Sequence, residues 1–133
     1  MTLPAPAPSP NTDTADFWAA TDRSELQLQR CSDCDVVIWY PRAICPQCWG
    51  QNLVVFIASG RGTVYSWTRT MKGNGDYREA GPYFLAYVEL EEGPRLMTNI
   101  VEGEPSIGQR VEVVFHDTGQ GSALVRFRPI SAS

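Results

Sequence analysis

The sequence predicts a mainly β protein with a short N-terminal helix, a ribbon built around four cysteines and a five-stranded barrel. Two observations support this class. The cysteines form two Cys-x-x-Cys pairs, Cys31/Cys34 and Cys45/Cys48, with ten residues between the pairs, and this is the ligand spacing of a ribbon-type metal site. After Ser59 come five short runs rich in β-branched and aromatic residues, separated by glycine-containing turns. Such a series indicates a small barrel.

The chain divides into three expected segments. Residues 1–13 are rich in proline and alanine and lack hydrophobic periodicity, so we expect a disordered arm. Residues 14–58 hold the helix and the ribbon, and residues 59–133 hold the barrel. At 133 residues, the chain fits one domain or two small ones that share an interface.

The first expected element is a short helix. Asp13 or Thr14 can cap it, and it runs to about Asp22. It carries two adjacent aromatics, Phe17 and Trp18. These side chains are either core anchors of the helix or docking points for a partner, and the sequence leaves both open.

The ribbon follows as strand, knuckle, strand, knuckle, strand. Leu26 and Leu28 alternate with glutamines, Val36–Tyr40 forms the returning strand, and Leu53–Ala58 leaves the ribbon. Four thiolates fill the tetrahedral sites of one ion and leave no position for substrate, so the metal is expected to be structural Zn²⁺. Iron in a rubredoxin-like site stays open as an alternative, because four sulfur ligands suit both metals. Disulfides or free thiols are a weaker alternative.

Charge and hydropathy limit where the protein is expected to act and what it is expected to bind. Residues Met1–Pro10 lack the basic start and apolar run of a secretory signal, so we expect a cytoplasmic protein. No stretch approaches the about 20 apolar residues of a membrane span. The formal net charge is −4, and neither half of the chain has the basic surplus that binding to nucleic-acid phosphates requires.

The barrel strands are expected in the second half, and an OB-type barrel is the first choice because closure removes exposed edges from so short a sheet. The runs are Thr63–Thr70, Tyr83–Leu90, Arg95–Val101, Gln109–Phe115 and Ala123–Arg128. Between the first two lies a long, glycine-broken segment, Met71–Pro82. We expect it to be a mobile loop over one mouth of the barrel.

Several sequence blocks resemble the family known as domain of unknown function 35, and the resemblance covers roughly residues 16–130. The blocks are Leu28-Gln29-Arg30-Cys31, Tyr40-Pro41-Arg42, Cys45-Pro46-Gln47-Cys48, Ser59-Gly60-Arg61-Gly62-Thr63-Val64-Tyr65-Ser66, Pro82-Tyr83, Val88-Glu89-Leu90-Glu91-Glu92-Gly93 and Ile107-Gly108. One departure is Asp35, where the family usually has glycine. If the knuckle needs a left-handed backbone there, Asp tolerates it at modest cost.

The resemblance implies a rubredoxin-like zinc ribbon joined to an OB fold, in an accessory protein of acyl-CoA and lipid metabolism. Members of the family associate with thiolase-fold enzymes, including lipid-transfer-protein-like aldolases that cleave steroid side-chain CoA thioesters. The resemblance therefore predicts a hetero-oligomer in which the partner supplies the chemistry. This chain would stabilise the partner and help to form its CoA or acyl channel.

The residues agree with a non-catalytic role and suggest two sets of contacts. The only histidine, His116, follows an apolar run beside Asp117, and neighbours on a strand point to opposite faces, so the two make a poor catalytic dyad. CoA phosphates need cations and its adenine needs a flat partner, which selects Arg69, Lys72, Tyr77, Arg78 and Tyr83. Partner docking would use Phe17, Trp18, Trp39, Tyr40 and Trp49.

Two other classes of function stay open. Zinc ribbons and OB folds both bind single-stranded nucleic acid in other proteins, and Tyr65, Trp67 and Arg69 would share one strand face. The net acidic charge argues against this function. The second is a rubredoxin-like electron carrier with iron in the cysteine site.

Overall fold

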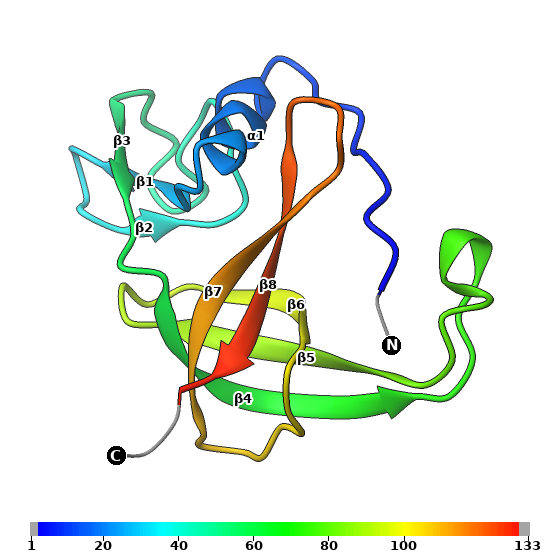
Figure 1. Cartoon of the computed structure of the whole chain (residues 1–133). Helices are drawn as coiled ribbons and strands as arrows, with labels where there is room; N and C mark the ends of the chain where they lie inside the picture. Colours follow the sequence, from blue (N-terminus) through cyan, green and yellow to red (C-terminus); the bar gives the residue numbers. More distant parts are fainter. Residues whose placement is uncertain (1–2, 131–133) are drawn as a thin grey trace.

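The computed structural model describes residues 3–130, and Figure 1 shows how its elements are arranged. Helix α1 and the small sheet formed by β1–β3 lie together at one end of the barrel formed by β4–β8. The elements are α1 (Ala15–Asp22), β1 (Gln27–Cys31), β2 (Val37–Ile38), β3 (Leu53–Ile57), β4 (Arg61–Thr70), the 3₁₀ turn η1 (Gly75–Tyr77), β5 (Tyr83–Leu90), β6 (Arg95–Ile100), β7 (Arg110–Asp117) and β8 (Ala123–Pro129). The predicted class, mainly β with one short helix, is confirmed.

The barrel closes in the order β4-β5-β6-β8-β7, with β7 returning to pair with β4. All neighbours are antiparallel except β6 and β8, which pair in parallel at Ile100 and Phe127. Closure depends on a close backbone approach at Gly62, where a Cβ atom would lie 2.6 Å from the carbonyl oxygen of Glu89. The predicted five-stranded OB-type barrel is therefore confirmed.

The ribbon sheet has the order β2-β1-β3. The strand predicted at Val36–Tyr40 is wrong in length, because only Val37 and Ile38 pair with β1. Beyond them the Gln29 side chain takes over the pairing: its amide accepts from the backbone N–H of Arg42 at 3.0 Å and donates to the carbonyl of Arg42 at 2.9 Å. A side chain thus continues the ladder where Pro41 has no N–H to offer.

One hydrophobic core joins the ribbon base, the helix and the barrel. Phe17 of α1 and Leu28 of β1 belong to the same buried cluster as Val88, Val111 and Phe127 of the barrel. The ribbon tip has only a small second cluster, formed by Ile38 with Cys31 and Cys45. Since so few apolar side chains are buried at the tip, its order depends on the cysteines.

Helix α1 is tied to β8 through Thr21. Its buried hydroxyl donates to the carbonyl of Trp18 at 2.6 Å and accepts from the backbone N–H of Ala123 at 3.0 Å. At the other end Thr14 is the N-cap residue, as predicted, but its side chain makes no capping bond. Instead it exchanges hydrogen bonds with Asn11.

The junction between ribbon and barrel is held by acidic residues of the β5–β6 turn. The backbone N–H of Ser59 donates to Glu92 at 2.8 Å, and Glu91 forms ion pairs with Arg61 and Arg110 at 3.4 and 2.9 Å. The pKa of Glu91 is lowered, first by the hydrogen bond from Arg110, then by one from the hydroxyl of Ser59 and by the contacts with Arg61. The turn before β4 and the β5–β6 turn are far apart in the sequence, and these ion pairs and hydrogen bonds hold them together.

The N-terminal arm runs from α1 past β8 toward η1 (Figure 1). Residues 3–10 contain no helix or strand, and the disorder predicted for residues 1–13 stays a prediction, as does the three-segment division. Residues 1–2 of the arm and 131–133 of the barrel segment lie outside the described residues. Within residues 3–130, α1 is too short to cross a membrane. The expected cytoplasmic location stays a prediction.

Candidate functional site

The four cysteines meet at the ribbon tip, where all four sulfur atoms lie within 4.8 Å of one another. The sulfurs of Cys31 and Cys48 are 3.5 Å apart, and those of Cys34 and Cys45 are 3.6 Å apart. Tetrahedral zinc with Zn–S bonds of about 2.3 Å separates its sulfurs by about 3.8 Å. The four cysteines therefore form a metal-binding cluster whose dimensions fit one zinc ion.

The two knuckles repeat the same backbone geometry. The N–H of Asp35 donates to the carbonyl of Cys31 at 2.8 Å, and the N–H of Trp49 donates to that of Cys45 at 2.9 Å. Asp35 and Trp49 both have positive φ, 67° and 66°. The left-handed backbone expected at Asp35 is therefore present, and each knuckle accepts a side chain at a position where glycine is favoured.

The negative charge of four ionised cysteines in this cluster has to be balanced by a cation. Burial raises the pKa of Cys45, but the N–H groups of Cys48 and Gln47 outweigh it and bring the pKa to about 7. The N–H of Gly50 lowers the pKa of Cys48, yet the sulfur of Cys31 and burial raise it to about 12. Four thiolates this close cannot all ionise unless a cation offsets their charge.

The four cysteines would hold the metal, and their sulfurs would complete its coordination. No water-binding or substrate-binding position then remains. The metal would stabilise the ribbon, and it would not activate a reactant.

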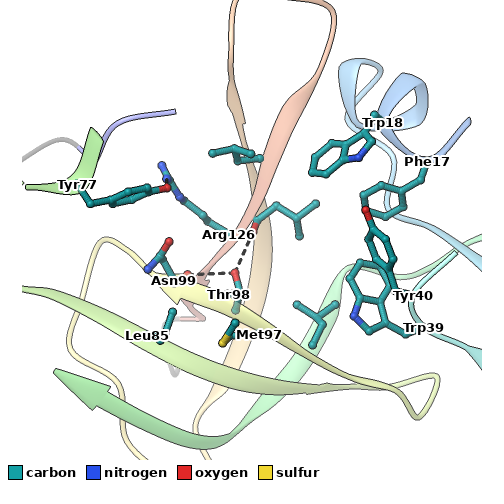
Figure 2. A pocket seen from close by; sticks show the side chains of 13 residues that line it. Phe17, Trp18, Trp39, Tyr40, Tyr77, Leu85, Met97, Thr98, Asn99 and Arg126 are labelled. Carbon is teal, nitrogen blue, oxygen red and sulfur yellow. Dashed lines mark hydrogen bonds between the residues drawn. The ribbon is translucent and has the colours of Figure 1, made fainter. Parts of the chain in front are cut away.

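A groove of about 250 Å³ lies between the ribbon, α1 and the barrel. Figure 2 shows its two ends: an aromatic group on one side, and Arg126 with Tyr77 on the other. The groove is open where β6 and β8 pair only at Ile100 and Phe127. There the hydroxyl of Thr98 donates to the carbonyl of Val125 at 2.9 Å and replaces a ladder bond.

Four of the five predicted docking residues meet at the aromatic end of the groove. The ring of Phe17 lies 5.0, 5.3 and 6.0 Å from the rings of Trp18, Trp39 and Tyr40. Phe17 is only 2% exposed, so it acts as the core anchor of this group. Trp49 does not join them: it stands on the second knuckle and is 78% exposed. The docking role of the set stays a prediction.

The five predicted CoA contacts are only partly brought together. Tyr77 and Tyr83 pack at 5.5 Å between ring centroids, and Tyr77 also lines the groove. Arg69, Lys72 and Arg78 are exposed, and none of them forms an ion pair within residues 3–130. Contact with CoA stays a prediction.

Arg126 is the residue that sequence reasoning missed. It is 1% exposed and donates to His116 Nδ1 at 2.7 Å, to the carbonyl of Pro4 at 2.6 Å and to the hydroxyl of Tyr77 at 2.9 Å. The available signal was a charged residue inside the apolar run of residues 123–127. Burial, and then the charge of Arg126, lower the pKa of His116. His116 therefore lies against Arg126 and away from Asp117, which accepts from the N–H of Gly119.

A second exposed surface lies on the barrel face of β4, β5 and β6. Tyr65, Tyr87 and Met97 are exposed there. Trp67 is not on this face: a bulge between Val64 and Ser66 places it opposite the buried Ala86, and its ring lies 5.7 Å from that of Phe84. The guanidinium of Arg95 covers the Tyr65 ring at 3.9 Å and pairs with Glu89 at 2.8 Å. The charge of Arg95 is thus already balanced by Glu89.

Comparison with known proteins places the two halves of the chain in one family. Residues 18–54 match the family model described as the ChsH2 rubredoxin-like zinc ribbon domain, and residues 57–116 match the ChsH2 C-terminal OB-fold domain. A DUF35 domain-containing scaffold protein of Methanocaldococcus jannaschii is 35% identical over 76% of this chain and 79% of its own length. The chain belongs to the DUF35 family.

Two further relatives of this DUF35 chain carry names that refer to enzymes. A probable enoyl-CoA hydratase alpha subunit of Thermomonospora curvata is 34% identical over 93% of this chain, which spans 40% of that relative. The solved structure named Ltp2-ChsH2(DUF35) aldolase contains a chain with a TM-score of 0.81 and 33% identity, covering 92% of this chain and 98% of that one. The predicted resemblance is confirmed.

Proposed function

We propose that this DUF35 chain is a non-catalytic accessory subunit that binds and stabilises a thiolase-fold enzyme acting on acyl-CoA thioesters. More specifically, the partner is a retro-aldolase of steroid side-chain degradation, and the two form a hetero-oligomer. The single observation that carries the proposal is the likeness to the chain of the Ltp2-ChsH2(DUF35) aldolase, which extends over nearly the full length of both chains.

The chemistry of the site supports an accessory role. The four thiols all lie in one closed cluster, and His116 is engaged by Arg126. Within residues 3–130, these contacts leave neither a cysteine nor a histidine free to act as nucleophile or base. In this proposal the metal holds the ribbon in one conformation, and the shared hydrophobic core packs the ribbon against the barrel.

The finer part of the proposal concerns CoA. Among the described residues, Arg69, Lys72 and Arg78 present cations without carboxylate partners on the long loop and the strand before it. Tyr77 and Tyr83 offer flat surfaces beside them. We propose that this loop faces the CoA channel of the partner, with the cations near the CoA phosphates.

Affinity capture of the tagged full-length chain from its native cells, followed by mass spectrometry, tests the accessory role. The expected product is a stoichiometric thiolase-fold protein. The purified partner, assayed on a steroid side-chain acyl-CoA, should lose activity and thermal stability when this chain is removed. A partner that is equally stable and active alone contradicts the proposal.

A double variant tests the CoA contact within the reconstituted complex. Lys72→Ala with Arg78→Ala should raise the KM for acyl-CoA and leave complex formation intact. Arg23→Ala is the matched control, because Arg23 is exposed and its ion pair with Glu25 is local. An unchanged KM in the double variant would remove these residues from the CoA site and leave the accessory role standing.

A further inference from the structure

The guanidinium of Arg126 is a buried charge surrounded by neutral acceptors. Its three hydrogen-bond partners are an imidazole nitrogen, a backbone carbonyl and a phenol hydroxyl, belonging to His116, Pro4 and Tyr77. A guanidinium can only donate, so Nδ1 of His116 accepts and its ring proton lies on Nε2 in the neutral form. None of the three partners supplies a negative charge.

The positive charge is not neutralised elsewhere in the described chain. Within residues 3–130, no carboxylate lies within 4.0 Å of Arg126. Within residues 3–130, three of the five guanidinium N–H groups donate to these neutral partners, and no carboxylate is among them. Because Arg stays protonated, burying its guanidinium without an opposite charge is unfavourable. Arg128, two residues along the strand, lies in contrast beside both Glu102 and Glu112.

The space that Arg126 faces is a groove with apolar walls. Leu85, Leu96, Leu124 and Val125 are among the residues that line it. Figure 2 shows Arg126 on one side of the groove and the aromatic group with Trp18 and Trp39 on the other. Its volume of about 250 Å³ is below the about 300–1,000 Å³ of pockets for drug-sized ligands. An occupant that fits must therefore be small, mostly apolar and able to accept hydrogen bonds from a guanidinium at one end.

We propose that this groove binds a small organic monocarboxylate, with its carboxylate on Arg126 and its apolar body against Trp18 and Trp39. A carboxylate matches the planar guanidinium and supplies the missing negative charge. One cation and a mostly apolar wall suit a single negative charge better than a phosphate dianion. The site is separate from the metal cluster, and its existence does not depend on the identity of the partner enzyme.

The Pro4 carbonyl holds the position where one carboxylate oxygen would bind. It accepts from Nη2 of Arg126 and comes from a segment without helix or strand. A carboxylate oxygen would replace this carbonyl on Nη2. The backbone amide signals of Leu3 and Ala5, which flank Pro4, would then report on occupancy together with those of β8.

The test is an NMR titration of the ¹⁵N-labelled full-length protein with 4-phenylbutyrate, and in parallel with uncharged 4-phenylbutyramide. The acid should bind at least about tenfold more tightly than the amide, because a hydrogen-bonded charge is lost in the amide. The indole N–H signals of Trp18 and Trp39 should shift, and that of Trp49 should not. Equal affinities, or no binding of the acid at millimolar concentration, would overturn the proposal.

Two substitutions sharpen the result. Arg126→Gln should weaken the binding of the acid by about tenfold or more and leave the affinity for the amide unchanged. Arg128→Gln should change neither affinity by more than about twofold. If Arg126→Gln does not fold, the acid and amide pair on the wild-type protein still decides the question. Acid binding that is lost in Arg128→Gln and kept in Arg126→Gln would also refute it.

Discussion

Replacing Cys48 by serine should open the ribbon tip and leave the barrel folded. Ordering the 17 residues that follow Cys31, up to Cys48, costs about 17 kcal/mol at about 1 kcal/mol each. Against this the tip buries Ile38, which contributes about 2 kcal/mol, and partly buries Val36 and Leu53, which contribute about 1 kcal/mol each. The shortfall of about 13 kcal/mol lies within the about 10–16 kcal/mol that zinc supplies to small structural sites.

Zinc content and hydrogen exchange measure this prediction. In Cys48→Ser, bound zinc should fall well below one ion per chain, and amides of residues 31–50 should exchange rapidly. Amides of β4–β8 should stay protected, because the barrel has its own strand pairing and core. Gln47→Ala is the matched control on the same exposed turn. A Cys48→Ser protein with one zinc per chain and a protected ribbon tip would refute the reasoning, and red colour after aerobic purification would indicate iron.

Three further predictions concern the barrel and its junctions. Thr21→Val should lower the free energy of unfolding by about 1–3 kcal/mol, because it leaves the buried N–H of Ala123 without an acceptor; urea denaturation measures this, and an unchanged midpoint contradicts it. Gly62→Ala should destabilise by about 1–3 kcal/mol or more, since the new Cβ would lie 2.6 Å from the Glu89 carbonyl; thermal unfolding measures this, with Thr63→Ala as the neighbouring control. Glu91→Gln should destabilise at pH 7 by an amount that shrinks as the pH falls below about 4.5. The folded-state pKa of Glu91 lies below its ordinary value of 4.5, so the stabilisation exists above that pH and is lost as the carboxylate becomes protonated. A difference in the free energy of unfolding between wild type and Glu91→Gln that is the same at pH 3 and pH 7 contradicts this assignment. Glu104→Gln serves as the control.

Local patterns were sufficient to predict the ribbon and the barrel strands. The cysteine spacing requires two tight knuckles, and the positive φ expected at Asp35 is present. The alternating and β-branched runs gave strand positions that agree with β4–β8 to within two residues at each end. Such features depend on residues close in the sequence, where turn chemistry and side-chain periodicity act directly.

The groove could not be predicted in the same way. It depends on where α1, β2 and β8 meet, and these elements lie far apart in the sequence. Arg126 looked like one more charged residue of a strand, because its burial results from the arm and from Tyr77 packing over it. The Glu91 network was missed for the same reason: Ser59 and Arg61 reach it from just before and at the start of β4, and Arg110 reaches it from β7.

The four tryptophans are distributed so that each part of the protein has its own optical reporter. Trp18 and Trp39 line the groove, Trp49 stands on the second knuckle beside the cysteines, and Trp67 of β4 packs edge-on against Phe84 of the barrel. Variants that each keep a single tryptophan would follow three events separately, by the emission wavelength and quenching of the remaining indole. Metal loss, filling of the groove and coverage of the barrel by another protein could then be timed independently.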